Sequence, residues 1–103
     1  MEIIYPQKIK KFFGALDNML ADRMARSIDL LERYGNLLEM PMSKPLGKGL
    51  FELRVMGNTH IRIFYCFHKN RIYLLHAIVK KNRRIPKQDI RLARGLMKRI
   101  VSI

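Results

Sequence analysis

Apolar and polar residues alternate from Leu50 to Val55, and two further apolar runs follow at residues 60–67 and 72–79. Alternation with a period of two predicts a strand that buries one face. The run at 60–67 is largely apolar on both sides, which is typical of a central strand. The β-branched and aromatic residues at 72–79 favour a strand over a helix. Because short polar turns separate the runs, the pattern predicts an antiparallel meander.

The turn at residues 57–59 sets the register of the first two strands, because pairing their apolar faces requires a loop of odd length. The apolar pairs predicted in this way are Val55 with Ile61, Leu53 with Ile63 and Phe51 with Tyr65. On the opposite face, Arg54 then stands directly across from Arg62. Facing cations repel each other unless an anion lies between them. The pair is therefore either solvated, with one arginine partly neutralised by Glu52, or part of an anion-binding site.

Two stretches of helical periodicity precede the meander. Residues 6–16 begin with a proline, which suits the first turn of a helix, and they carry apolar residues at helical spacing. Asp17 and Asn18 are favourable N-caps for a second helix, and Gly35 is a favourable stop. The apolar side of that helix is formed by Leu20, Met24, Ile28, Leu31 and Tyr34. Together the two stretches predict a helical hairpin that covers one face of the sheet.

The remaining segments are less regular. Residues 1–5 are predicted as an edge strand or an arm, and residues 36–49, which hold two prolines and two glycines, as an irregular connection. A third helix is predicted to start at Pro86, with an apolar side formed by Ile90, Ala93, Met97 and Ile100. Its cations Lys87, Arg91, Arg94 and Lys98 share one face. That face is either solvated or in contact with phosphates or an acidic surface.

The chain length of 103 residues suits one domain with a single core, so we expect one domain over residues 1–103. No apolar run approaches the ~20 residues that cross a bilayer, and the N-terminus lacks the pattern of a signal peptide. We therefore expect a cytoplasmic protein. The single cysteine, Cys66, lies inside a predicted strand and is expected to be a small buried hydrophobe rather than a reactive thiol.

Positive charge is concentrated in the second part of the chain. Residues 1–43 hold six Lys and Arg against six Asp and Glu, whereas residues 44–103 hold fifteen against two, so the whole net charge of +13 arises there. Four of these cations, Lys80, Lys81, Arg83 and Arg84, follow the last predicted strand and are called the basic lip below. Such a concentration indicates a surface that binds polyanions. Nucleic acid is the leading candidate partner, an acidic protein the second and an anionic membrane surface the third.

The sequence contains few candidate metal ligands and few candidate catalytic carboxylates. His60, His68 and His76 are separated by strand and turn, and no cluster has metal-ligand spacing, so no metal and no cofactor are expected. After residue 39 the acidic residues are Glu52 and Asp89. A pair of catalytic carboxylates is therefore nearly excluded.

The order of the elements and three motifs resemble the RelE/ParE toxin superfamily, most closely its phage-derived HigB-like branch. The motifs are L-x-x-G-L-x-E-L-R at Leu46–Arg54, I-R-I-F-Y at Ile61–Tyr65 and H-A-I-V-K-K at His76–Lys81, with Pro86 a few residues later. The likeness extends from about Pro6 to Met97. It implies an α+β fold of the RelE type, in which a helical hairpin packs on a small antiparallel sheet and a C-terminal helix follows.

The resemblance also implies an activity. It suggests the toxin of a type II toxin–antitoxin system, a metal-independent endoribonuclease that cleaves messenger RNA in the ribosomal A site. In such enzymes the RNA 2′-hydroxyl attacks the adjacent phosphate. A site made of cations suits this chemistry, because the transition state carries extra negative charge on the phosphate oxygens. The implied partners are the ribosome, its messenger RNA and a helix-turn-helix antitoxin of HigA type, with no membrane.

Five residues are implied as catalytic. Arg62 matches the arginine of the family's central strand, Arg54 the cation on the preceding strand, and Lys80 and Lys81 the cations that end the last strand. In the family, a tyrosine after the basic lip takes part in proton transfer, but residues 80–103 here contain no Tyr, Phe or His. His60, which is predicted on the Arg62 face, or one of the lysines would then transfer the protons. The cations predicted to bind RNA are Lys44, Lys48, Arg83, Arg84, Lys87 and Arg91.

Two alternatives to RNA cleavage stay open. The first is a toxin of the same fold that binds gyrase, and the second is a phage-derived module that binds nucleic acid or a partner without catalysis. An antitoxin is expected to cover the cationic site or to hold it away from the ribosome with an acidic or amphipathic segment. If the N-terminal arm leaves the edge at Leu50–Val55 free, the antitoxin could bind there as an added strand.

Overall fold

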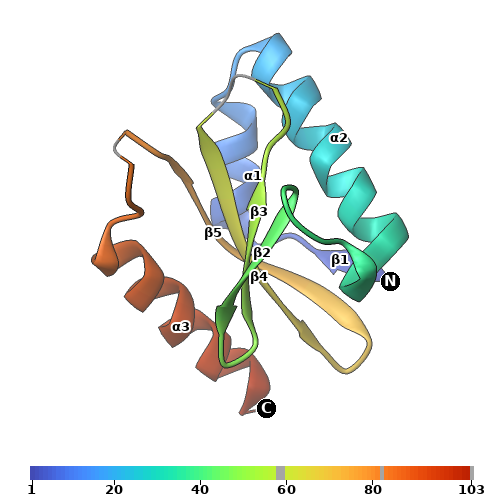
Figure 1. Ribbon diagram of the computed structural model, residues 1–103, viewed down its shortest axis with the longest axis vertical. Coiled ribbons are helices and arrows are strands. Elements are labelled where there is room, and N and C mark those ends of the chain that lie inside the picture. The colour runs from blue at the N-terminus through green and yellow to red at the C-terminus, as the bar shows by residue number, and fades with distance from the viewer. Residues whose placement is uncertain (58–59, 82, 103) are drawn as a thin grey trace.

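The described part of the chain has an α+β architecture of three α-helices and a five-stranded mixed sheet (Figure 1). The computed structural model describes residues 1–57, 60–81 and 83–102. In chain order the elements are β1 (Glu2–Ile4), α1 (Gln7–Gly14), α2 (Asn18–Tyr34), a short 3-10 helix η1 (Gly35–Leu37), β2 (Ser43–Gly47), β3 (Leu50–Arg54), β4 (Ile61–His68), β5 (Arg71–Val79) and α3 (Lys87–Val101). This confirms the predicted fold class and the C-terminal helix.

The sheet has the strand order β1-β5-β4-β3-β2. The pairs from β2 to β5 are antiparallel, as the meander predicted, but β1 pairs parallel with the start of β5. The sheet is therefore mixed rather than antiparallel throughout. The N-terminal segment is an edge strand, which was one of the two expectations for it.

Helix ends follow the local signals in the sequence. Pro6 and Pro86 directly precede α1 and α3. The Asp17 carboxylate accepts a hydrogen bond of 2.9 Å from the Leu20 amide and so caps α2, while Gly35 ends α2 with a φ of +53°. Tyr34, the last residue of α2, is 52% exposed, so the predicted apolar side of this helix ends at Leu31.

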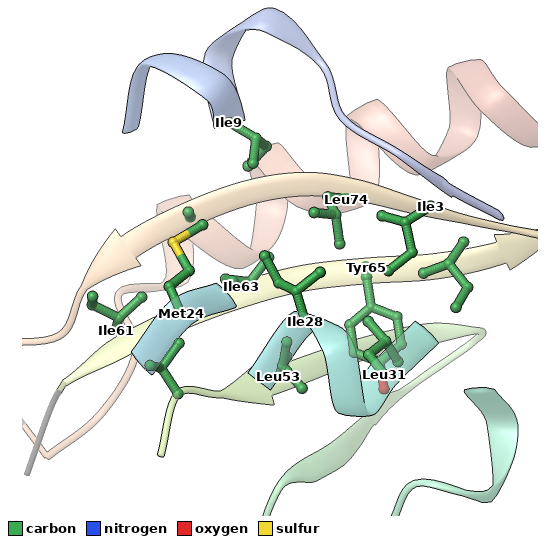
Figure 2. Packing of buried hydrophobic residues seen from close by; sticks show 13 residues of the cluster. Ile3, Ile9, Met24, Ile28, Leu31, Leu53, Ile61, Ile63, Tyr65 and Leu74 are labelled. Atoms are coloured by element: carbon green, nitrogen blue, oxygen red, sulfur yellow. The ribbon is translucent and has the colours of Figure 1, made fainter. Parts of the chain in front are cut away.

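Two hydrophobic layers enclose the sheet. On one face α1 and α2 pack on the strands, and Figure 2 shows Met24, Ile28 and Leu31 of α2 directed at the sheet residues Ile63 and Tyr65. On the other face α3 packs through Ala93 and its neighbours. The predicted helical hairpin over one face is confirmed, and α3 covers part of the second face. Among the described residues, no helix is long and apolar enough to cross a membrane.

The register between β3 and β4 is the predicted one. Leu53 lies opposite Ile63, Phe51 opposite Tyr65 and Arg54 opposite Arg62. The Val55 amide donates to the Ile61 carbonyl at 3.2 Å, which places this last predicted pair side by side as well. Asn58 and Thr59 of the predicted turn lie outside the described residues.

The segment at residues 36–49 is more regular than its prolines and glycines predicted. Residues 43–47 form β2, which pairs with β3 and is the outer strand of the sheet on that side. Proline is tolerated on an edge strand, where its missing N–H faces away from the ladder. Because β2 occupies the outer side of β3, the predicted addition of a partner strand to Leu50–Val55 is wrong.

The pairing of β4 with β5 contains a one-residue bulge. Phe64 lies opposite His76, but Tyr65 lies opposite Leu74, so Leu75 is an extra residue in β5. Before the bulge Leu74 packs with α1 and α2, and after it Ala77 does so. The residues of β5 that face α1 and α2 therefore have even numbers before Leu75 and odd numbers after it.

Candidate functional site

Three strand ends bring the predicted catalytic residues to one end of the sheet. Arg54 ends β3 and lies opposite Arg62 near the start of β4. His60 precedes β4, and its carbonyl accepts a hydrogen bond of 2.7 Å from the amide of Lys80, which follows β5. Lys81 comes next in the chain. The fold thus gathers the five predicted catalytic residues around the end of the β3–β4–β5 meander.

Glu52 supplies the anion between the two facing arginines. Its side chain is almost fully buried, and its Oε1 lies 2.9 Å from Arg62 Nε and 3.6 Å from Arg54 Nε. The contacts are ion pairs, because neither Nε forms a hydrogen bond of good geometry with a partner. The Arg54 and Arg62 side chains are 32% and 14% exposed. Glu52 therefore contacts both arginines rather than one, and Arg62 is largely buried whereas Arg54 keeps about a third of its side chain exposed.

The sequence contains a signal for this bridge. Glu52 and Arg54 are two residues apart on one strand and so share a face of the sheet. Glu52 lies opposite Phe64, which makes Arg62 its diagonal neighbour on β4. The sequence analysis expected Glu52 to neutralise one arginine only. The same-strand spacing accounts for the contact with Arg54, and the diagonal position accounts for the contact with Arg62.

A pocket opens beside the arginine pair. It has a volume of about 320 Å³ and is lined by Pro41, Met42, Arg54, Val55, Met56, Gly57 and Arg62. The Nη1 of Arg62 donates to its neighbouring Ile61 carbonyl at 3.0 Å, so this guanidinium is held both by its own strand and by Glu52. The pocket therefore combines apolar walls with two oriented cations.

A second hollow, of about 500 Å³, lies at the basic lip and is lined by His60, Lys80, Lys81 and Arg83. Lys80 is half-buried and the other three residues are exposed. No acidic residue is among the described residues that line it. The two hollows share no lining residue, but both are lined in part from the start of β4, one by His60 and the other by Arg62. Cations at the ends of three strands therefore lie at this end of the sheet.

The chain matches a known protein family. Residues 11–98 match the family described as phage derived protein Gp49-like (DUF891). The chain belongs to this family. The Gp49-like family is part of the RelE/ParE-like toxin superfamily, and its members are generally toxin-like proteins of toxin–antitoxin systems. No curated protein matches the chain.

The family assignment confirms the predicted superfamily, while the HigB-like branch stays a prediction. The matched region includes both pockets, from Pro41 in the first to Arg83 in the second. It also includes Glu52 and most of α3. The match therefore covers the elements that form the candidate site.

The cations predicted to bind RNA are more scattered in this Gp49-like protein. Lys44 is exposed on β2 opposite Glu52, but Lys48 lies in the β2–β3 turn, at the other end of β3 from Arg54. Four strand steps, roughly 14 Å, separate the two ends of β3. Arg83 lines the second hollow, whereas Arg91 lies in a separate hollow on the outside of α3. Arg84 and Lys87 are exposed between the lip and the start of α3.

Arg94 departs from the predicted cationic face of α3. Its Nη1 donates to the Gly47 carbonyl at 3.0 Å and its Nη2 to the Leu46 carbonyl at 2.8 Å. The side chain thus ties α3 to the β2–β3 hairpin, while Lys87, Arg91 and Lys98 are exposed. The four cations do not form one uniform surface, because one of them satisfies backbone carbonyls.

A contact that the sequence analysis missed joins His76 to Asp89. The buried His76 Nε2 lies 2.8 Å from the Asp89 Oδ1, and its ring stacks on Phe64 with ring centroids 5.9 Å apart. His76 is therefore not isolated. Because His76 is on β5 and Asp89 is in the first turn of α3, the contact joins the two elements on either side of the basic lip.

Other groups contribute little to the candidate chemistry. Burial raises the pKa of the Cys66 thiol to about 11, which confirms its prediction as a buried hydrophobe. Burial also raises the pKa of Tyr65, whose hydroxyl shares a hydrogen bond with Ser43. Within the described part of the chain, no group of three or more His, Cys, Asp and Glu is arranged to hold a metal ion. The cations at the strand ends remain the candidate functional groups.

Proposed function

We propose that this Gp49-like protein is the toxin of a type II toxin–antitoxin system and that it cleaves messenger RNA on the ribosome. The observation that supports the proposal is the arginine pair, which Glu52 holds in place beside one pocket. His60, Lys80, Lys81 and Arg83 line a second hollow at the same end of the sheet. Such fixed cations match a phosphate that gains negative charge during the reaction, and they require no reorganisation when it does.

The proposed step is a transesterification within the RNA. The 2′-oxygen loses its proton and attacks the adjacent phosphorus, so a 2′,3′-cyclic phosphate forms as the bond to the 5′-oxygen breaks. The departing 5′-oxygen takes up a proton. Arg54 and Arg62 stabilise the charge on the phosphate oxygens, Lys80 and Lys81 add positive charge at the lip, and His60 or one of these lysines moves the protons.

A helix-turn-helix antitoxin is the proposed partner that holds the toxin inactive, and it would cover this cationic end of the sheet. The concentration of cations in residues 44–103 supports such a partner. A gyrase-binding toxin of the same fold is the second candidate, because residues 80–103 lack the aromatic residue that takes part in proton transfer in RNA-cleaving relatives.

Controlled expression in growing bacteria tests the proposal. RNA cleavage predicts loss of translation with cut messages, gyrase poisoning predicts loss of replication with DNA damage, and a non-catalytic module predicts normal growth. Removing only the arginines would leave Glu52 buried without a partner. The informative variant therefore carries Glu52→Gln, Arg54→Gln and Arg62→Gln together, a net loss of one positive charge.

The matched control is Arg99→Gln, which also removes one positive charge but is exposed, lies outside both hollows and is not among the cations predicted to bind RNA. Growth arrest should disappear in the triple variant and persist in the control, provided that circular dichroism shows both to be folded. Full toxicity of a folded triple variant would exclude the arginine pair as the site. His60→Gln should lower the cleavage rate and change its pH profile while ribosome binding is kept, if His60 moves the protons.

A further inference from the structure

The outer edge of β5 is covered over part of its length. β1 pairs with Arg71–Tyr73, and no other described strand lies on that edge toward Val79 (Figure 1). Lys80 donates to the His60 carbonyl, and hydrogen-bonded pairs alternate along an antiparallel ladder. The main-chain groups of Ile78 therefore face β4, while those of Ala77 and Val79 face outward. Four backbone hydrogen-bonding groups are presented at this edge.

The other sheet edges carry features that discourage pairing with another chain. β2 contains Lys44 and Pro45, and its register shifts between Pro45 and Gly47. The outer side of β1 belongs to a strand of only three residues, which includes the exposed Glu2. Prolines, charges, bulges and short strands are the usual protection of edges. The segment Ala77–Val79 holds no proline, no charged residue and no register shift, and Val79 is 51% exposed while Ala77 is 8% exposed.

This edge forms the floor of a groove of about 540 Å³. Phe12 of α1 lines it on one side of the sheet, and Pro86, Gln88 and Asp89 at the start of α3 line it on the other. Successive side chains of a strand point to opposite faces. A strand added beside Val79 would direct one set of side chains toward Phe12 and the other toward α3.

The charges around the groove favour an acidic occupant. Lys81 lines it, and Lys8 precedes Phe12 by one helical turn on the same face of α1. Lys87 is exposed at the start of α3. Asp89, the acidic residue among the described lining residues, is already hydrogen-bonded to His76. The groove therefore combines a strand edge with no described strand beside it, apolar walls and positive rims, which consist of the lining Lys81 and of Lys8 and Lys87, exposed on the two flanking helices.

We propose that the β5 edge at Ala77–Val79 binds an extended, acidic segment of a partner protein as an added strand. Backbone N–H and C=O groups would pair along the edge, and acidic side chains would meet the lysines of the rims. RNA carries the right charge but lacks the alternating N–H and C=O groups of a strand. The inference is independent of RNA cleavage, since it depends on the edge and its groove alone.

Amide hydrogen exchange of the full-length, ¹⁵N-labelled protein tests this proposal. The probe is a capped heptapeptide of alternating glutamate and valine, and the control probes are the same peptide with proline at each valine, the lysine–valine peptide and an octauridylate. Millimolar glutamate–valine peptide should slow exchange of the Ala77 and Val79 amides at least tenfold, whereas the control probes should not. Protection at β1 or β2 instead, protection by octauridylate alone, or no binding of the peptide would overturn the proposal.

A variant pair separates backbone pairing from charge attraction. Val79→Pro removes an outward-facing N–H without removing a bond to β4, and Val79→Thr keeps the N–H while changing the side chain. Peptide binding should weaken about tenfold in the proline variant and less than twofold in the threonine variant. Equal affinities in a folded proline variant would refute strand addition. If that variant does not fold, the exchange pattern of the unmodified protein decides the question.

Discussion

Replacing Glu52 by glutamine keeps the shape of the side chain but removes the negative charge between Arg54 and Arg62. Its Oε1 lies 2.9 Å and 3.6 Å from the two Nε atoms, so these atoms are at most about 6.5 Å apart. At an effective dielectric constant of about 20, two positive charges at that separation repel by about 2.5 kcal/mol. Solvent near the one-third exposed Arg54 reduces this repulsion, while loss of a buried ion-pair partner adds to the cost.

We therefore expect Glu52→Gln to lower the free energy of unfolding by about 2–3 kcal/mol, which is a large part of the ~5–15 kcal/mol typical of a domain. Urea denaturation at neutral pH and low salt measures it. Adding Arg54→Gln to the variant should restore part of the loss, because the facing positive charge is then gone. High salt should also restore part of it, since screening weakens the repulsion.

The single Arg54→Gln variant completes the thermodynamic cycle. It should lower the free energy of unfolding by less than Glu52→Gln does, because Glu52 keeps Arg62 as a partner. The reasoning would be refuted if Glu52→Gln changed the unfolding free energy by less than about 0.5 kcal/mol. It would also be refuted if the two substitutions were additive and insensitive to salt, since neighbouring charges must couple.

Two further predictions concern stability. Burial raises the pKa of Cys66 from 9.0 to about 11, so the folded state keeps a proton that the unfolded state loses, and this contribution to stability is intact below pH 9 and lost between pH 9 and 11. The free energy of unfolding, measured with urea, should therefore fall more steeply between pH 9 and pH 11 in the unmodified protein than in Cys66→Ala. The difference should reach about 2 kcal/mol at pH 11. An equal fall in both proteins would contradict the raised pKa of Cys66. Arg94→Ala should lower stability by about 1–2 kcal/mol and speed amide exchange in the β2–β3 hairpin, because two carbonyls lose their donor, whereas the exposed Lys98→Ala should change neither.

Local patterns predicted those parts of the fold that local chemistry decides. Alternation identified the first meander strand, and continuous apolar runs rich in β-branched and aromatic residues identified the other two. Asp17 and Gly35 marked the ends of α2 because capping acts within one turn. Strand β2 was missed because Pro45 and Gly47 resemble a loop in sequence, although both are compatible with an edge strand. The parallel pairing of β1 with β5 joins residues about seventy positions apart, and no local pattern specifies it.

In the candidate site, too, some contacts follow from local sequence patterns and others depend on tertiary packing. The opposition of Arg54 and Arg62 follows from matching two apolar faces, and the sequence could therefore predict it. The contact of His76 with Asp89 depends on how α3 lies over the sheet, and this is decided by tertiary packing. Arg94 was misassigned for the same reason, since helical spacing cannot show that the β2–β3 hairpin passes beneath it.

The extra residue Leu75 has a consequence for comparison among relatives. It divides β5 into two halves that are out of phase, and the half that leads to Lys80 owes its orientation to Leu75, which lines neither hollow. In a relative without the bulge, an ungapped alignment through β5 would equate residues on opposite faces of the sheet. An alignment used to assign function at the strand ends should therefore be anchored at the basic lip and extended toward the β4–β5 turn, with a one-residue gap allowed at Leu75. An alignment anchored at the turn would carry the error into the lip.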